Sequence, residues 1–104
     1  MNIQFKKGVL ELIVLLILNK QDEYGYSLIK KITDKISISE GTVYPILRKL
    51  VLEEFLDTYF QPSNEGPARK YYSMTTQGKK RLNNLLEEWN DFINIIEIFI
   101  KENS

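Results

Sequence analysis

The stretch SEGTVYPILRKL, which runs from Ser39 to Leu50, has the pattern of a short helix with one apolar face. Its apolar side chains recur at three- and four-residue spacing and predict a buried stripe of Val43, Ile46, Leu47 and Leu50. Small polar, aromatic and basic side chains occupy the other face. This combination predicts a helix that is held in place by its apolar stripe and enters a groove of DNA with its opposite side.

The first turn of this helix can begin at either of two residues. If Ser39 is the N-cap, Glu40 lies in the first turn, where the helix dipole favours a carboxylate. Pro45 then removes the backbone hydrogen bond to Gly41. If Thr42 is the N-cap, Pro45 lies in the first turn and its missing N–H loses no bond. We favour Ser39, followed by a tight and irregular first turn.

Length and composition indicate a single small globular domain. A chain of 104 residues buries only a modest core by itself, which makes a partner chain plausible. Its 43% hydrophobic and 27% charged residues are typical of a folded chain rather than a disordered one. The longest unbroken apolar run, Leu12–Leu18, is too short to span a bilayer, and no small-residue cleavage site follows Lys6 and Lys7. We therefore expect neither a membrane span nor a signal peptide, and the absence of cysteine is compatible with the cytoplasm.

The net charge of zero is unevenly distributed along the chain. Residues 1–81 contain 13 Lys and Arg against 9 Asp and Glu, a net charge of +4, whereas residues 82–104 contain 1 against 5, a net charge of −4. This division suits a basic head that meets phosphate and an acidic tail with another role.

Two predicted helices precede the Ser39–Leu50 stretch. The first, Phe5–Asn19, is apolar nearly all round, so we expect a second subunit to cover part of it. Glu11 is its only charged residue after Gly8. A polar turn leads to the second helix, Tyr24–Ile36, which has an apolar face of Leu28, Ile29, Ile32 and Ile36 and a charged face of Lys30, Lys31, Asp34 and Lys35. With the connection Ser37–Ser39, the second and third helices form a helix-turn-helix.

A wing and a long helix complete the predicted fold. Residues 55–60 and 69–74 predict two strands, and the proline- and glycine-containing segment between them, 61–68, predicts a loop. Thr75 is the predicted N-cap of the last helix, whose heptad-like apolar positions are Leu82, Leu85, Leu86, Trp89, Phe92, Ile93, Ile96, Phe99 and Ile100. About 25 helical residues extend roughly 37 Å, longer than this head can cover.

The expected fold class is therefore mainly α (α+β), with a winged helix-turn-helix head and a long C-terminal helix. We assign residues 1–74 to a winged helix-turn-helix DNA-binding domain. Residues 75–104 are assigned to a dimerisation helix that is continuous with the head. The apolar side chains that the head leaves uncovered require another chain.

Several segments, in their order and spacing, resemble the PadR family of bacterial transcriptional regulators. They are KGVLELIVLLIL, EYGYSLIKKI, EGTVYPILRKL, GPARKYYSMTTQG and EEWNDF, and the similarity runs from about Lys7 to Ile100. The resemblance implies a homodimeric winged helix repressor, whose last helix crosses to the partner and which releases its operator when an inducer binds or conditions change. The short last helix resembles the smaller members. Phe55 stands where relatives usually carry glycine, so the turn into the first strand is expected to differ.

The candidate DNA contacts come from the two helices and the wing. Arg48 and Thr42 are the candidate readers of base edges, since arginine to guanine is the commonest specific contact. Contacts to phosphate, which position the protein without specifying sequence, are expected from Tyr44, which matches a family tyrosine, and from Lys49, Ser39, Tyr24 and Lys30. Arg69 and Lys70, at the root of the wing, are expected along the DNA backbone or in the minor groove. For each basic residue alone, the alternative is a solvated surface charge.

Trp89 is a second candidate site, for a small molecule. It matches the family tryptophan that in some relatives lines a dimer-interface cavity for flat aromatic ligands. A large aromatic residue in a helix seam is more often a packing residue, and we favour packing. If a cavity forms, its expected walls are Trp89, Phe92, Ile96 and Leu12.

Enzyme functions are poorly supported. The chain has no histidine or cysteine, so the usual general bases, thiol nucleophiles and transition-metal ligands are missing, and no nucleotide-binding glycine motif is present. We expect no cofactor, and we expect the carboxylates of Glu53, Glu54 and Asp57 to be hydrated rather than to hold a metal. Lys79, Lys80 and Arg81 open the last helix against its dipole, which hints at a phosphate partner.

Two functions remain open. The first is a homodimeric repressor that binds double-stranded DNA at an imperfect inverted repeat, with half-sites about one helical turn apart. The second is a winged helix module that binds another protein without specific DNA recognition.

Overall fold

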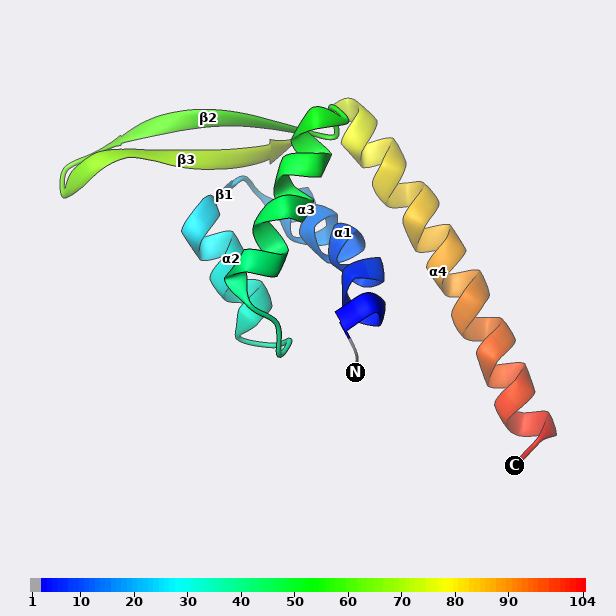
Figure 1. Cartoon of the computed structure of the whole chain (residues 1–104). Coiled ribbons are helices and arrows are strands. Elements are labelled where there is room, and N and C mark those ends of the chain that lie inside the picture. Colours follow the sequence, from blue (N-terminus) through cyan, green and yellow to red (C-terminus); the bar gives the residue numbers. More distant parts are fainter. Residues whose placement is uncertain (1–2) are drawn as a thin grey trace.

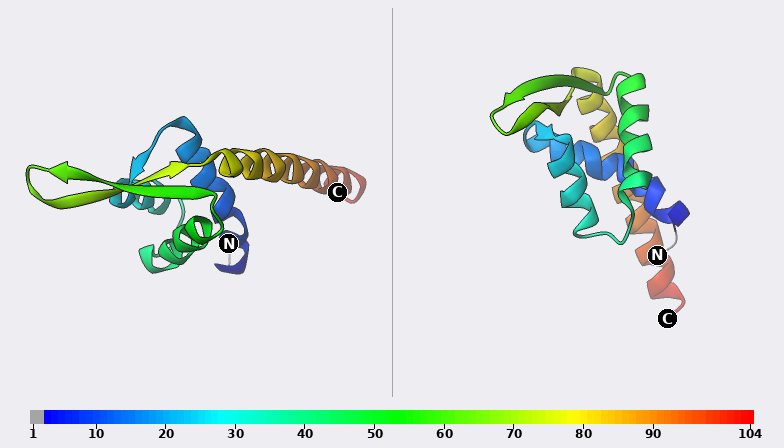
Figure 2. Two further views of the ribbon diagram at one scale, coloured as in Figure 1. Left: turned by 90° about the horizontal axis from the view of Figure 1, so that it is seen from above. Right: turned by 60° about the vertical axis from the view of Figure 1, so that its left-hand side comes forward.

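Helix α1 (Ile3–Lys20) runs through the middle of the molecule and contacts α2, α3, β3 and α4. This computed structural model describes residues 3–104, with side chains from Val9 onward. After α1 the elements are β1 (Glu23–Tyr24), α2 (Gly25–Thr33), α3 (Glu40–Leu52), β2 (Leu56–Ser63), β3 (Gly66–Met74) and α4 (Thr76–Glu102). The wing formed by β2 and β3 and the helix α4 leave this body in opposite directions (Figure 1, Figure 2). The predicted fold class, mainly α with a winged helix-turn-helix, is confirmed.

The core is a single apolar cluster around α1. Its fully buried side chains come from every helix and from the base of the wing, namely Leu10, Val14, Leu15, Leu28, Ile29, Ile32, Val43, Leu47, Leu50, Leu56 and Leu82. The predicted stripe of α3 supplies three of these, while Ile46 is partly buried. The stripe that defines α3 in the sequence therefore holds it on the body, with its opposite face free.

Helix α2 is shorter than predicted at both ends. It spans Gly25–Thr33 rather than Tyr24–Ile36, because Glu23 and Tyr24 form the short strand β1 opposite Tyr72 and Tyr71. The buried carboxylate of Glu23 is paired with Lys31 of α2. A strand of two residues has no periodicity for a sequence pattern to reveal.

Helix α3 begins as predicted, with Ser39 at the N-cap position. The Ser39 side chain makes no capping bond to the backbone and lies 3.0 Å from the hydroxyl oxygen of Thr42. The Thr42 amide donates to the Ser39 carbonyl at 3.1 Å, a three-residue hydrogen bond that makes the first turn tight.

The end of α3 is a turn in which Glu54 adopts a left-handed backbone conformation, with φ of 65°. The amides of Phe55 and Glu54 donate to the carbonyls of Leu50 and Val51, at 2.9 and 3.0 Å. This pair of bonds is the Schellman arrangement that usually has glycine at the left-handed residue. The hydrogen bonds are thus those of the usual turn, with a glutamate, Glu54, at the left-handed position. The expected difference from relatives at Phe55 stays a prediction.

The wing is longer than predicted. The expected loop 61–68 is wrong, since the strands continue to Ser63 and from Gly66, and only Asn64 and Glu65 form the turn. Proline is tolerated because β2 is an edge strand, in the order β1-β3-β2, and Pro62 lies at an irregularity in the register between Gln61 and Ser63.

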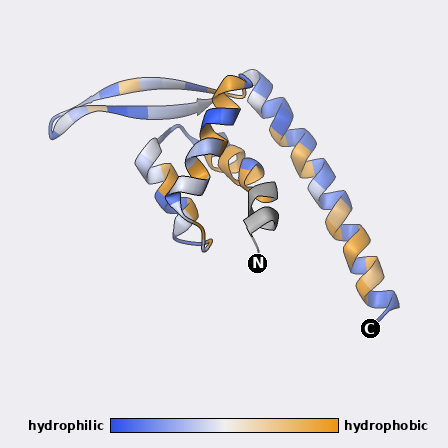
Figure 3. Cartoon of the chain, in the orientation of Figure 1, coloured by the Kyte–Doolittle hydropathy of each residue, from blue (hydrophilic) through white to orange (hydrophobic). Residues whose placement is uncertain are grey.

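Helix α4 begins at its predicted cap, where the Thr75 hydroxyl accepts a hydrogen bond from the Gly78 amide at 2.9 Å. Its first half packs on α1, with Leu82 buried and Leu85, Leu86 and Trp89 partly buried. Beyond Trp89, Ile93 is partly buried and the other large apolar side chains are 42–59% exposed, and these are Phe92, Ile95, Ile96, Ile98, Phe99 and Ile100. Figure 3 shows this apolar surface continuing along the free half of the helix. Within residues 3–104, no helix has both the length and the apolar character needed to cross a membrane.

Candidate nucleic-acid interface

The exposed face of α3 meets the root of the wing at Tyr72. Tyr44, 45% exposed, and Arg48 of α3 lie close enough to Tyr72 to influence its ionisation. Burial raises the pKa of the Tyr72 phenol, the neighbouring Tyr44 adds to this, and the positive charge of Arg48 opposes it. The ammonium group of Lys70 lies 5.5 Å from the centre of the Tyr72 ring. Helix and wing therefore place Tyr44, Arg48 and Lys70 near the same aromatic ring, that of Tyr72.

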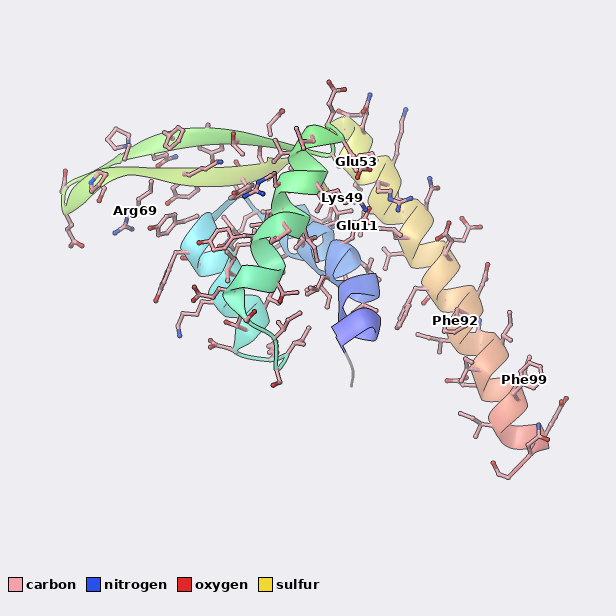
Figure 4. All side chains as sticks on the ribbon, in the orientation of Figure 1. Glu11, Lys49, Glu53, Arg69, Phe92 and Phe99 are labelled. Carbon is pink, nitrogen blue, oxygen red and sulfur yellow. The ribbon has the colours of Figure 1, made fainter. Side chains whose placement is uncertain are left out.

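Arg69 lies on the opposite face of the wing from Lys70, because neighbouring residues of a strand point to opposite faces. Its guanidinium carbon is 5.0 Å from the centre of the Tyr24 ring, and one of its nitrogens is 3.9 Å from the Glu65 carboxylate. Figure 4 shows Arg69 projecting from β3 on the side where α2 begins. Arg69 and Lys70, which were predicted to contact DNA together, thus lie on different surfaces of the wing, Arg69 beside Tyr24 and Lys70 beside Tyr72.

Three tyrosines cross the sheet beside Arg69. The ring of Tyr71 stacks on Tyr59 at 5.6 Å and is tilted against Tyr24 at 5.9 Å. The Tyr59 hydroxyl donates to the Asp22 carboxylate at 2.7 Å, which raises the pKa of Tyr59. This row stiffens the junction between the wing and the start of α2. These tyrosines were not predicted as part of a site, although the alternation along the two strands, with Tyr59 opposite Tyr71, places both on one face.

Lys49 is turned toward the body rather than toward the Tyr44 side of α3. Its ammonium lies 3.7 Å from the Glu11 carboxylate and 3.6 Å from the Glu53 carboxylate. These three side chains gather between α1, α3 and the start of α4 (Figure 4). The prediction that Lys49 contacts phosphate stands untested, but its charge is already partly neutralised within the protein.

The remaining predicted contacts lie around the helix-turn-helix. The Ser39 and Thr42 hydroxyls are within hydrogen-bonding distance of each other at the start of α3. Lys30, on the exposed face of α2, lies 3.6 Å from the Asp34 carboxylate. Two exposed aromatic side chains that the sequence analysis did not single out flank this surface, Tyr26 on α2 and Phe60 on β2.

The cations that open α4 have partners inside the protein. Lys79 donates to the Asn19 side chain at 2.7 Å, and Arg81 donates to Glu11 at 2.8 Å. These contacts account for two of the three cations without a phosphate. Within the part of the chain that the structure describes, no group of three carboxylates is placed to hold a metal ion.

The candidate small-molecule site is a shallow cavity between α1 and α4. It encloses about 160 Å³ and is lined by Val9, Leu12, Leu85, Glu88, Trp89 and Phe92. The rings of Trp89 and Phe92 are 6.3 Å apart and tilted by 46°. Three of the four predicted walls are thus brought together, whereas Ile96 does not line the cavity. In one chain the cavity is smaller than the roughly 300 Å³ that a drug-sized ligand requires.

A helix-turn-helix joined to a two-stranded wing, with basic and aromatic side chains where they meet, defines the winged helix-turn-helix class of proteins. Residues 14–84 match the model of the transcriptional regulator PadR-like family. The chain belongs to this family.

Solved structures of similar proteins agree with this assignment. A Streptococcus transcriptional regulator has 32% identity and a TM-score of 0.83, over 94% of this chain and 98% of its own. A protein of Streptococcus mutans UA159 has 38% identity and a TM-score of 0.83, over 92% and 90%. A PadR-like transcriptional regulator of Bacillus cereus has 31% identity and a TM-score of 0.83, over 93% and 96%.

Proposed function

We propose that this protein is a homodimeric, sequence-specific DNA-binding repressor that acts in the cytoplasm and leaves its operator in response to a small molecule or stress. The observation that carries the proposal is the grouping of Tyr44, Arg48 and Lys70 at the junction of α3 and the wing. The major groove of B-DNA admits an α-helix, and an exposed helix beside a projecting wing meets both a groove and the adjoining backbone.

The proposed contacts divide into readers and positioning contacts. Arg48 and Thr42 read base edges in the major groove, while Tyr44, Ser39, Lys30 and Tyr24 contact phosphate. Lys70 follows the backbone beside α3, and Arg69 reaches the minor groove from the other face of the wing. We assign Lys49 a small phosphate contribution, because Glu11 and Glu53 compete for its ammonium.

The free half of α4 supports the homodimer. Six large apolar side chains beyond Trp89 are exposed on a helix that the head does not cover. In a two-fold dimer each α4 buries the same surface of the other, and the two α3 helices then face half-sites about one helical turn, roughly 34 Å, apart. An imperfect inverted repeat is the DNA symmetry that such a dimer requires.

We place the signal molecule in the cavity between α1 and α4. The cavity lined by Trp89, Phe92 and Leu12 adjoins the exposed part of α4, so a second α4 enlarges it. A flat aromatic compound in that position alters how the two chains meet, which changes the separation of the heads. Quenching of the single tryptophan by such a compound tests this step, and no quenching across a broad panel counts against it.

The test of DNA binding uses a duplex that carries the region upstream of the gene, with random DNA as competitor. Arg48→Ala and Tyr44→Phe are expected to weaken the specific complex, and the parent affinity is expected to fall steeply with salt. Lys101→Ala, in the last turn of α4, is the control that removes one positive charge outside the proposed DNA contacts. If both α3 variants bind like the parent, the protein-interaction module becomes the better description, with the exposed α4 surface as its docking site.

A further inference from the structure

Glu11 is the only charged residue between Gly8 and Asn19 of α1, and its side chain is only 15% exposed. It lies where the end of α3 and the start of α4 come together before the two helices diverge (Figure 1, Figure 4). In the described part of the chain, α3 and α4 pack little against each other, because α4 packs on α1 and on β3. Glu11 therefore occupies the place where the two helices can be connected.

One oxygen of this carboxylate holds α4. The Nε atom of Arg81, in the second turn of α4, donates to Glu11 Oε1 at 2.8 Å, and this bond raises the pKa of the guanidinium. The guanidinium carbon also lies 5.9 Å from the centre of the Phe55 ring, at the entrance to the wing. Arg81 is thus held from two sides.

The second oxygen faces α3. Glu11 Oε2 lies 3.7 Å from the ammonium of Lys49, in the last turns of α3, and Glu53 lies 3.6 Å from the same ammonium. A single carboxylate consequently contacts one cation from each helix. The contact to Arg81 is a directional hydrogen bond and the contact to Lys49 is a longer ion pair. Such charged contacts add little net stability compared with an apolar side chain, but they can specify one arrangement among several.

We propose that Glu11 is a positioning residue for DNA binding, because it fixes the angle between α3, which enters the groove, and α4, which joins the two subunits. The inference rests on the proposed function. In a dimer with a fixed α4 pair, that angle sets the distance and rotation between the two α3 helices. Half-sites of one spacing are then accepted and others rejected.

The first test measures the tolerance for half-site spacing. Duplexes are selected from a random pool with the parent protein, and their spacers are then lengthened or shortened by one or two base pairs. Two base pairs rotate one half-site by roughly 70°, and we expect the parent to lose about tenfold in affinity. Glu11→Gln, which keeps the shape but removes the charge, is expected to lose less than about threefold across the same series.

A matched control separates positioning from stability. Asp34→Asn removes a carboxylate from the exposed Lys30–Asp34 pair on α2 and is expected to keep the parent's spacing profile. Arg81→Lys keeps the charge but removes the Nε donor, and it is expected to resemble Glu11→Gln. The proposal would be overturned if the affinity of Glu11→Gln depended on half-site spacing in the same way as that of the parent, whatever its absolute affinity.

A second test needs no DNA. The chain has no cysteine, so Glu40→Cys, exposed at the start of α3, carries one spin label per head. In the dimer, double electron–electron resonance should give a narrow distribution of inter-label distances for the parent and for Asp34→Asn. The distribution for Glu11→Gln should be broader. Equal widths would overturn the inference about Glu11 alone. A parent that is monomeric, or that selects no inverted repeat, would instead contradict the proposed function and this inference with it.

Discussion

Gly78 of α4 lies so close to the carbonyl oxygen of Phe55 that a β-carbon at position 78 would be 2.2 Å from it. The same β-carbon would be 2.8 Å from Met74 Cγ. Around this contact, the Thr75 amide donates to the Phe55 carbonyl at 3.1 Å and the Thr75 hydroxyl donates to the Glu54 carbonyl at 2.7 Å. The first turn of α4 is thus fixed against the entrance of the wing by backbone atoms that cannot move independently.

Gly78→Ala is expected to destabilise the protein by about 3 kcal/mol or more, because the added methyl group meets a backbone carbonyl rather than a flexible side chain. Urea unfolding followed by circular dichroism measures this. Gly66→Ala is the control, since a β-carbon there meets nothing within 4 Å. A Gly78→Ala protein as stable as the Gly66→Ala protein would show that α4 does not sit as described.

Glu54→Gly is expected to stabilise the protein by about 0.5–1 kcal/mol, because glycine adopts the left-handed conformation without the strain that a side chain brings. The neighbouring Glu53 has a negative φ of −83°, which any residue adopts, and its carboxylate pairs with Lys49, so Glu53→Gly is expected to lower stability. The urea midpoints of these two variants, compared with that of the parent, show whether glycine stabilises position 54 and destabilises position 53. A loss of stability in Glu54→Gly would contradict the geometry of this turn.

Arg48→Ala is expected to lower the affinity for a selected operator by about 1–3 kcal/mol while changing binding to random DNA much less, because it removes a base contact. Lys30→Ala is expected to weaken both complexes slightly and equally, since Lys30 is assigned to a phosphate contact alone. Fluorescence anisotropy with the selected and the random duplex gives the loss of affinity for each. The assignment of the reader is wrong if Lys30→Ala reduces specificity more than Arg48→Ala.

Phe99→Glu is expected to prevent dimerisation, because it places a charge among the apolar side chains at the free end of α4. Asn94→Glu adds the same charge at an exposed polar position and serves as the control. Sedimentation velocity distinguishes the 12.3 kDa chain from its dimer. Dimers that tolerate Phe99→Glu as well as Asn94→Glu would place the subunit contact elsewhere.

Stability is expected to fall at alkaline pH through Tyr72. Its pKa is raised in the folded protein, mainly by burial, so above about pH 10 the unfolded chain loses the phenolic proton first. This contribution is fully present below pH 10 and is lost as the pH rises through the folded pKa. Tyr72→Phe should therefore show a smaller decrease in urea midpoint between about pH 8 and pH 11 than the parent. An unchanged decrease would contradict this origin.

The elements that the sequence predicted well are those with a strong local signal. The apolar period of α3 and the threonine cap of α4 both appear where expected. The wing was underestimated because Pro62 and Gly66 indicate a loop. In the structure Pro62 lies in the edge strand β2, which tolerates proline, and Gly66 is the first residue of β3, directly after the turn. Strand β1 was missed because it forms only through its pairing with β3.

The candidate interface was predicted by residue type rather than by contact. Arg69 and Lys70 are neighbours in the sequence and lie on opposite faces of the wing, which strand alternation alone indicates. The pairing of Lys49 with Glu11 joins residues on different helices, and no local pattern reveals it. Glu11 stands out in the sequence as the only charged residue between Gly8 and Asn19, but only the fold shows its two partners, Lys49 and Arg81.

The most direct test of the central claim is sedimentation equilibrium of the protein with a fluorescent duplex that carries its selected inverted repeat. A homodimer whose two α3 helices each face one half-site predicts two chains per duplex, without a populated one-chain complex. Scrambling one half-site is expected to abolish the two-chain complex. Single 12.3 kDa chains that bind the intact and scrambled duplexes equally, or neither of them, would contradict it.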